Sequence, residues 1–226
     1  HTTEEEEVKG LNRADLVWAI KKEEQLQFES MGTDADVRTL IHVDSHRRAV
    51  FPHLENGYLT FGFIGARNNI NKVNLENFLK VAVPIFEKTL APLQLLIAGS
   101  VGKDLSVEQS SFVKSIGYVD SVDEFYDSID ISIVPMEFST GLKIKVGEAI
   151  ARSKPMLAHK HAMEGYLVNH ALHQCESFFE LAQEMARIAY DFSDLESLAK
   201  ASEDLHLHSF SAVDAELEFI DRTVLN

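Results

Sequence analysis

The sequence predicts an α/β protein built on a doubly wound parallel sheet. From about residue 58 onward, short runs of apolar and β-branched residues alternate with segments of helical periodicity. The run over residues 93–99 is almost continuously apolar, which is typical of a strand buried on both faces of a parallel sheet. Because right-handed crossovers join parallel strands, this alternation places helices on both faces of the sheet.

The expected elements follow one another in a regular order. Strands are expected at residues 59–65, 93–99, 113–118, 131–134 and 155–158, and helices at 71–90, 122–129, 142–153, 177–190, 194–203 and 211–224. Pro84 lies inside the first of these helices, where it predicts a kink. Before residue 58, the pattern indicates a helix start at 4–7, strands at 14–20 and 37–43, and a helix at 23–31.

This order predicts a main domain over residues 58–210, preceded by a separate stretch of strands and helices over residues 1–50. Residues 51–57 contain proline, asparagine and glycine, which is typical of a linker. Residues 211–226 contain the last expected helix. The chain begins with histidine rather than methionine, so we expect a piece of a longer protein whose N-terminal domain is largely missing.

A strand, a glycine loop and a cationic helix follow one another between Asp130 and Pro155. Pro135 ends the strand, and Gly141 in the loop can adopt backbone angles that other residues avoid. Helical spacing puts one set of side chains on the buried face, namely Ile144, Val146, Gly147, Ile150 and Ala151, and a second set on the opposite face, namely Lys145, Glu148 and Arg152. Unpaired amides and the dipole at a helix start favour an anion, so the stretch predicts a phosphate site.

Charge and cysteine content exclude several classes of protein. The formal net charge of −15 argues against a nucleic-acid partner, which would be repelled. Residues 143–160 nonetheless carry five lysine and arginine side chains, which suits a small anionic ligand. Cys175 is the single cysteine, so no intrachain disulfide can form and we expect a cytoplasmic protein. The sequence lacks an apolar run of about 18 residues, so we expect no transmembrane segment.

Two further patterns do not predict a functional site. His159 and His161 share one face of a strand, but zinc needs three or four ligands and no third ligand follows nearby. We therefore expect solvent-exposed histidines and no metal. The glycines around Phe63 fail the three-glycine spacing of a dinucleotide-binding fingerprint, which argues against a hydride-transfer enzyme.

Pro135, Gly141, Lys145 and Glu148, followed by Pro155, resemble the donor-binding segment of GT-B glycosyltransferases of family 4, the glycosyl transferases group 1. Four further segments resemble the same domain in the same order, namely Phe63-Ile64-Gly65 with Asn74, Leu95 to Gly99, Gly117-Tyr118-Val119-Asp120, and Ala162 to Gly165. The resemblance covers about residues 58–190. It implies that the main domain is the Rossmann-like, nucleotide-sugar-binding half of a GT-B fold. It also implies that residues 1–50 are the tail of the N-terminal, acceptor-side domain, and that residues 211–226 pack back toward them as a C-terminal helix.

The resemblance also implies a role for each candidate site residue. Glu148 would accept hydrogen bonds from the ribose hydroxyls of a nucleoside diphosphate sugar, and Lys145 and Arg67 would hold its diphosphate as charge develops on it. The loops at Gly65 and at Tyr118 and Val119 would converge on the same strand ends. Backbone amides of Thr140, Gly141 and Leu142 could contact the phosphate or the sugar. The spacing alone equally allows Glu148 to be a surface carboxylate paired with Lys145 or Arg152.

The implied activity is retaining transfer of a sugar from a nucleoside diphosphate donor to a sugar, lipid or protein acceptor, without a metal or cofactor. Thr140 departs from the family pattern, in which many members have a glutamate eight positions before Glu148. A non-catalytic nucleotide- or carbohydrate-binding module is therefore an alternative, and a doubly wound regulatory domain with residues 141–152 as ordinary surface is a third. Since the acceptor half is largely missing, we do not expect this piece alone to catalyse transfer.

Overall fold

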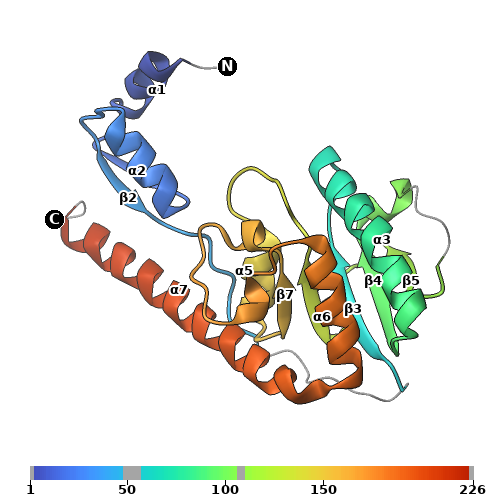
Figure 1. The fold of residues 1–226 in the computed structure, drawn as a ribbon. Coiled ribbons are helices and arrows are strands. Elements are labelled where there is room, and N and C mark those ends of the chain that lie inside the picture. Colours follow the sequence, from blue (N-terminus) through green and yellow to red (C-terminus); the bar gives the residue numbers. More distant parts are fainter. Residues whose placement is uncertain (1–2, 48–56, 106–109, 224–226) are drawn as a thin grey trace.

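A five-stranded parallel sheet forms the centre of the protein. The computed structural model describes residues 3–47, 57–105 and 110–223. The strand order is β5-β4-β3-β6-β7, and the strands span β3 (Leu59–Ile64), β4 (Leu93–Ala98), β5 (Val113–Gly117), β6 (Ile131–Val134) and β7 (Met156–Ala158) (Figure 1). Every pairing is parallel, so the predicted fold class is confirmed. All five strands end at the same edge of the sheet, where parallel sheets bind ligands.

Helices pack against the faces of the sheet. The helices α3 (Asn69–Thr89) and α6 (Phe178–Tyr190) lie side by side, with the rings of Phe78 and Phe178 5.8 Å apart in an edge-on arrangement (Figure 1). The short helix α4 (Val122–Asp127) packs against Gly62, where a Cβ atom would lie only 2.9 Å from the Phe125 ring. Side chains alternate along a strand, so α4 lies on the face opposite to Phe61 and Phe63. The helix α5 (Ile144–Ala151) follows β6.

Several connections are single turns of 3-10 helix. They are η1 (Ser100–Asp104), η2 (Lys160–Met163), η3 (Ala171–His173) and η4 (Phe192–Asp194). The residues of β6 are buried throughout, as expected for a central parallel strand, whereas β4 alternates between buried and half-buried residues. The apolar run over residues 93–99 therefore predicted the strand correctly but overestimated its burial.

The C-terminal segment is one long helix, α7 (Leu195–Thr223), which packs along α5. The prediction of two helices, over residues 194–203 and 211–224, is wrong between residues 204 and 210. Leu205 and His206 in this stretch are buried, so the packed stripe of the helix continues through the expected gap. Residue 224 lies outside the described residues.

The N-terminal part forms a separate, smaller unit. Two parallel strands, β1 (Leu16–Ala19) and β2 (Asp36–Thr39), carry the helices α1 (Glu4–Leu11) and α2 (Lys22–Ser30) (Figure 1). The far end of α7 reaches this unit, where Arg38 contacts Glu216 at 2.6 Å and lies 3.9 Å above the Phe219 ring. The assignment of residues 1–50 to an acceptor-side domain stays a prediction, and residues 51–56 of the predicted linker lie outside the described residues.

Candidate functional site

A cavity of about 440 Å³ opens at the carboxyl ends of β3, β4 and β5, beside the start of α5. It is lined by residues from the connections after these three strands and from the helices α3, α4 and α5, namely Ile64, Gly65, Ala66, Asn71, Gly99, Ser100, Tyr118, Val119, Asp120, Val122, Ile144, Lys145 and Glu148. Five of the predicted site residues, namely Gly65, Tyr118, Val119, Lys145 and Glu148, therefore meet around one cavity. Its size and its place at the strand ends suit a small-molecule ligand.

Two glycines bring the loops after β3 and β4 into close contact. Gly99 has a φ of +85°, and a Cβ atom there would lie 2.2 Å from the carbonyl oxygen of Gly65. The backbone N–H of Val101 donates to the same carbonyl at 3.2 Å. Only glycine fits this position, because both the backbone angle and the space exclude a side chain. The floor of the cavity is therefore backbone, with N–H and carbonyl groups near its surface.

The helix α5 starts where the cavity opens. Gly141 precedes it with a φ of +65°, as the glycine loop predicted. In the described part of the chain, no side chain caps the first turn of α5, which leaves its positive end available to an anion. Val146 and Ile150 are buried as expected, but Ile144 is 58% exposed and lines the cavity, so its assignment to the buried face is wrong.

Lys145 places a cationic group in the cavity wall. Its Nζ lies 3.3 Å from Asn71 Oδ1 and 5.5 Å from the centroid of the Phe63 ring. Burial lowers the pKa of Lys145, and the charge of Lys143 adds to this, while Glu148 opposes it. A cation whose hydration is already reduced gains more from an anionic ligand than an exposed lysine does.

Glu148 lies one turn further along α5, on the same cavity. Its Oε2 is 3.4 Å from the hydroxyl oxygen of Tyr126. Burial raises the pKa of Glu148, and the nearby carboxylate of Asp44 acts in the same direction. Arg152, Lys145 and the Tyr126 hydroxyl lower it. A carboxylate in these surroundings can accept hydrogen bonds from ligand hydroxyls, and Lys145 next to it can hold an anion.

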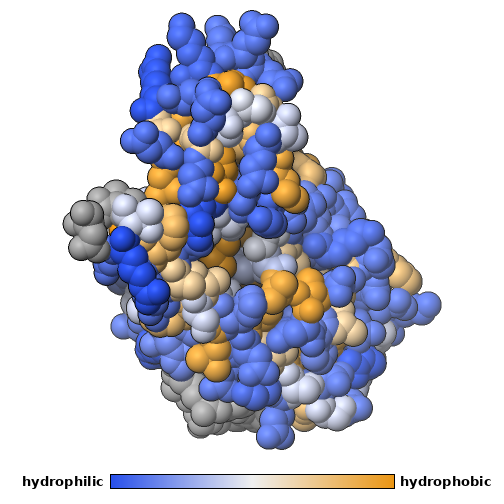
Figure 2. Space-filling model, turned by 90° about the vertical axis from the view of Figure 1, so that its left-hand side faces the viewer, coloured by the Kyte–Doolittle hydropathy of each residue, from blue (hydrophilic) through white to orange (hydrophobic). Residues whose placement is uncertain are grey.

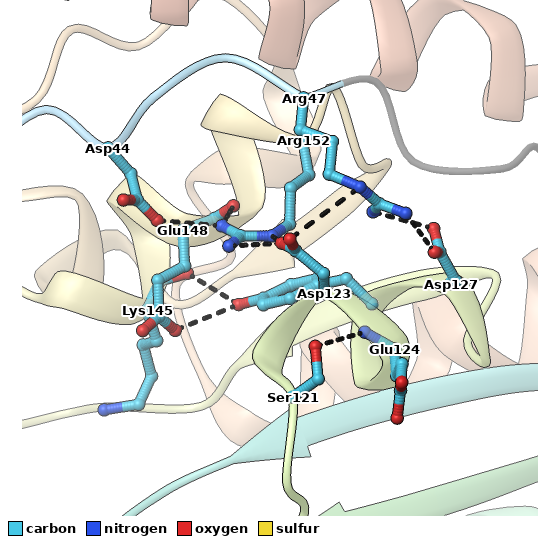
Figure 3. A network of polar contacts seen from close by, with 10 residues as sticks. Asp44, Arg47, Ser121, Asp123, Glu124, Asp127, Lys145, Glu148 and Arg152 are labelled. Carbon is cyan, nitrogen blue, oxygen red and sulfur yellow. Dashed lines mark hydrogen bonds and ion pairs between the residues drawn. The ribbon is translucent and has the colours of Figure 1, made fainter.

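A network of charges lies behind Glu148 (Figure 3). Arg152 donates to Asp44 at 3.0 Å and to Asp123 at 2.8 Å, and Arg47 pairs with Asp127 in the same region. Arg152, predicted on the face of α5 opposite the buried one, is only 8% exposed, because α4 and the segment around Asp44 cover it. It donates to the backbone carbonyl of Glu148 at 2.9 Å rather than to the carboxylate. The alternative in which Arg152 and Glu148 form a surface ion pair is therefore not what the structure shows.

The remaining predicted site residues lie away from this cavity. Arg67 lines a separate hollow of about 300 Å³ with Asn68, Asn69, Lys72 and Val101. Thr140, Gly141 and Leu142 do not line this cavity, and Gly141 lies near the N-terminal unit, where a Cβ atom added to it would be 3.5 Å from Ile20 Cδ1. Figure 2 shows hydrophobic surface where this unit meets the main body. The roles of Arg67 and of the 140–142 loop stay predictions.

Two asparagines of α3 contribute to the surroundings of the site. Asn74 is buried, and its amide accepts from Glu137 N at 2.8 Å and donates to Phe138 O at 2.9 Å, which fixes the loop after β6. Its neighbour on α3, Asn71, contacts Lys145. Helical spacing places both amides on one face of a helix that was predicted. Asn74 was part of the family resemblance, whereas no pattern in the sequence distinguishes Asn71 from ordinary polar helix residues.

The two histidines after β7 serve other purposes than metal binding. His161 lies 3.0 Å from Ser139 Oγ through Nε2 and 2.8 Å from Glu164 through Nδ1. His159 is 5% exposed, which corrects the expectation that it faces solvent. Within the described residues, no group of three histidine, cysteine, aspartate or glutamate side chains could hold a metal ion.

The sheet order, the strand-end cavity and the small second sheet define one half of a GT-B glycosyltransferase fold. The structure of Anabaena Alr3699/HepE in complex with UDP has a TM-score of 0.70 and 16% identity, and the match covers 97% of this chain and 67% of that one. S. aureus TarM, solved with fondaparinux, alpha-GlcNAc-glycerol and UDP, has a TM-score of 0.72 and 13% identity over 93% of this chain and 45% of that one. The pneumococcal O-GlcNAc transferase GtfA, solved with UDP and GlcNAc, has a TM-score of 0.61 and 12% identity over 97% and 47%.

The family of the protein follows from a match to its sequence. Residues 58–191 match the model of the glycosyl transferases group 1, which is more than half of the chain, and the protein belongs to that family. The chain spans about half the length of TarM and GtfA, at 45% and 47%, and about two thirds of Alr3699/HepE. The sequence matches no curated protein. Among the helices of the described residues, none combines the length and the apolar character that a membrane crossing requires.

Proposed function

We propose that this chain is the donor-binding portion of a retaining glycosyltransferase that transfers a sugar from a nucleoside diphosphate sugar to a sugar, lipid or protein acceptor. The observation that carries the proposal is the pair formed by Lys145 and Glu148. The two side chains lie one turn apart on α5 and line one cavity at the strand ends. A cation and a carboxylate at that spacing suit the diphosphate and the ribose of one nucleotide.

In this proposal the diphosphate lies at the start of α5. The helix dipole and the ammonium group of Lys145 stabilise its charge, which grows as the bond to the sugar breaks. Glu148 accepts hydrogen bonds from the ribose hydroxyls, because an ionised carboxylate offers several acceptor positions to two neighbouring hydroxyls. Backbone groups near Gly65 and Gly99 line the opposite wall of the cavity. UDP in the structures of related fold is consistent with such a ligand.

The proposal assigns the other parts of the chain as follows. Residues 1–50 are the end of the acceptor-side domain, and the last turns of α7 pack against it through Glu216. Thr140, Gly141 and Leu142 lie between the two parts, where the donor sugar and the acceptor would meet. Retention of the anomeric configuration rests on the family resemblance. The base, the donor sugar and the acceptor are left open.

Calorimetric titration with UDP and with GDP tests the binding step. We expect one of them to bind the folded chain, and Lys145→Ala and Glu148→Ala to weaken it. No binding of either nucleotide at millimolar concentration would contradict the proposal. In the longer protein, release of sugar from the donor that is lost in both variants would exclude the non-catalytic alternative, and NMR of the anomeric proton of the product would test retention.

A further inference from the structure

Tyr126 brings a buried hydroxyl group to the turn of α5 that lines the cavity. The side chain belongs to α4 and has no exposed surface. Its ring meets Phe125 edge-on with 5.5 Å between the centroids, and the guanidinium of Arg152 lies 5.1 Å from the ring centroid. Because both contacts hold the ring, the hydroxyl has a fixed position next to α5.

The Tyr126 hydroxyl lies near two acceptors on the cavity turn, and the side chain of Ser132 on β6 is a further hydrogen-bonding neighbour. Its oxygen lies 3.3 Å from the backbone carbonyl oxygen of Lys145 and 3.4 Å from Glu148 Oε2. Burial raises the pKa of Tyr126 well above its usual value, so the hydroxyl keeps its proton and acts as a donor. A charged acceptor attracts a donor more strongly than a neutral one, so an ionised Glu148 is the favoured partner.

Glu148 needs such a donor because it is largely withdrawn from water. Burial and Asp44 both raise its pKa, and the hydroxyl of Tyr126 is one of the groups that oppose this, together with Arg152 and Lys145. Arg152 directs its N–H groups to Asp44, to Asp123 and to the backbone of Glu148. The Tyr126 hydroxyl, in contrast, reaches the carboxylate itself.

We propose that Tyr126 is a positioning residue for Glu148. Its hydroxyl holds Oε2 in place and leaves the second carboxylate oxygen to accept from the ribose of the nucleotide. The inference rests on the proposed function, since it assumes that Glu148 faces the ribose. Tyr126 itself does not line the cavity and touches no ligand in this account.

The test compares UDP with 2′,3′-dideoxy-UDP, which lacks both ribose hydroxyls, in wild type and in Tyr126→Phe. The phenylalanine keeps the ring and its packing and removes only the hydroxyl. We expect wild type to prefer UDP by about tenfold, as for hydrogen bonds to a charged group, and the variant to lose most of this preference. The affinity for dideoxy-UDP should stay within about twofold. If GDP binds more tightly than UDP, the same comparison is made with GDP and 2′,3′-dideoxy-GDP.

Tyr166→Phe is the matched control. Tyr166 is also a buried tyrosine at α5, and its hydroxyl donates to the Lys143 carbonyl at 3.3 Å. The Tyr166→Phe variant should keep the preference for UDP over dideoxy-UDP. A further readout is the pH profile, since loss of the Tyr126 donor raises the pKa of Glu148 further and shifts the preference for UDP to higher pH. A change in general stability alone would leave that profile in place.

The possible outcomes distinguish the role of Glu148 in binding the ribose from the role of Tyr126 in positioning Glu148. A wild type that does not distinguish UDP from dideoxy-UDP contradicts the role of Glu148 and with it the proposed function. A Tyr126→Phe variant that keeps the full preference, or loses both ligands equally, overturns the role of Tyr126 alone. If the variant does not fold, NMR of the wild type decides: the slowly exchanging Tyr126 hydroxyl proton should shift on addition of UDP and not of dideoxy-UDP, and an identical response to both overturns the inference.

Discussion

The guanidinium of Arg152 lies 3.0 Å from the carboxylate of Asp44, which joins the segment leaving β2 to the helix that carries Glu148 (Figure 3). The same guanidinium contacts Asp123 of α4 at 2.7 Å. One buried cation therefore holds three parts of the chain together behind the cavity. The position of Glu148 in the cavity wall therefore depends on the contacts of Arg152 as well as on the packing of α5.

Arg152→Ala should lower the free energy of unfolding by about 2 kcal/mol or more, because it leaves two carboxylates without their buried partner. Chemical denaturation followed by circular dichroism measures the change. Arg222→Ala is the control: this arginine is 78% exposed and pairs with Glu218 one turn away, and such pairs contribute about 0.5 kcal/mol or less. Equal effects of the two substitutions would show that the Arg152 contacts are not stabilising.

Gly99→Ala should destabilise the fold and abolish nucleotide binding. The new methyl group would lie 2.2 Å from the carbonyl oxygen of Gly65, at a φ of +85° that alanine avoids, and we expect a cost of about 2 kcal/mol or more. Gly10→Ala, in α1, has no atom within 4 Å of the added Cβ and should be neutral or slightly stabilising. Thermal melting of both variants provides the comparison, and a neutral Gly99→Ala would rule out the close approach of the two loops.

The charge of Lys145 should give nucleotide binding a distinctive pH dependence. Burial lowers its pKa, so the ammonium loses its proton at a lower pH than an exposed lysine does. UDP affinity should therefore decrease with rising pH, and the decrease should begin at a lower pH than the titration of an exposed lysine would give. Where the wild-type Lys145 is charged, Lys145→Met should weaken UDP binding by about tenfold or more, and this difference should become smaller as the pH rises. Lys145→Arg, which stays charged, should show a flatter profile. Lys72→Met, at a position where the side chain is 40% exposed and pairs with Glu76, should leave the pH profile of the wild type unchanged.

The ionisation of Glu148 should make the preference for UDP over dideoxy-UDP depend on pH in the acidic range. Because burial raises its pKa, the carboxylate becomes protonated at a higher pH than an exposed glutamate. The preference for UDP over dideoxy-UDP should then decrease as the pH falls, and at pH values where ordinary glutamates are still ionised. Glu148→Gln should remove both the preference and its pH dependence. A preference that persists in this variant would show that another group binds the ribose.

The order of strands and helices followed from the sequence because apolar periodicity is a local signal. The strand at residues 131–134 was predicted at the limits that the structure shows, and β3 and β4 within one residue. The join of two expected helices into α7 was missed, since His206, His208 and Ser209 have modest helix propensity and no local pattern shows that part of this stretch is buried.

The site was predictable where one helix defines it and not where several elements meet. Spacing along α5 brought Lys145 and Glu148 together correctly. It misplaced Arg152, because a helical wheel assumes one covering layer, and here α4 and the segment around Asp44 cover a second side. Arg67 is close to Gly65 in sequence, but it lines a different hollow beside α3.

A crystal structure of the chain with UDP, or with GDP if that nucleotide binds more tightly, tests the central claim most directly. The account predicts the ribose hydroxyls within hydrogen-bonding distance of Glu148, and the diphosphate at the first turn of α5 beside Lys145. A nucleotide bound elsewhere, with both side chains clear of it, would contradict the account.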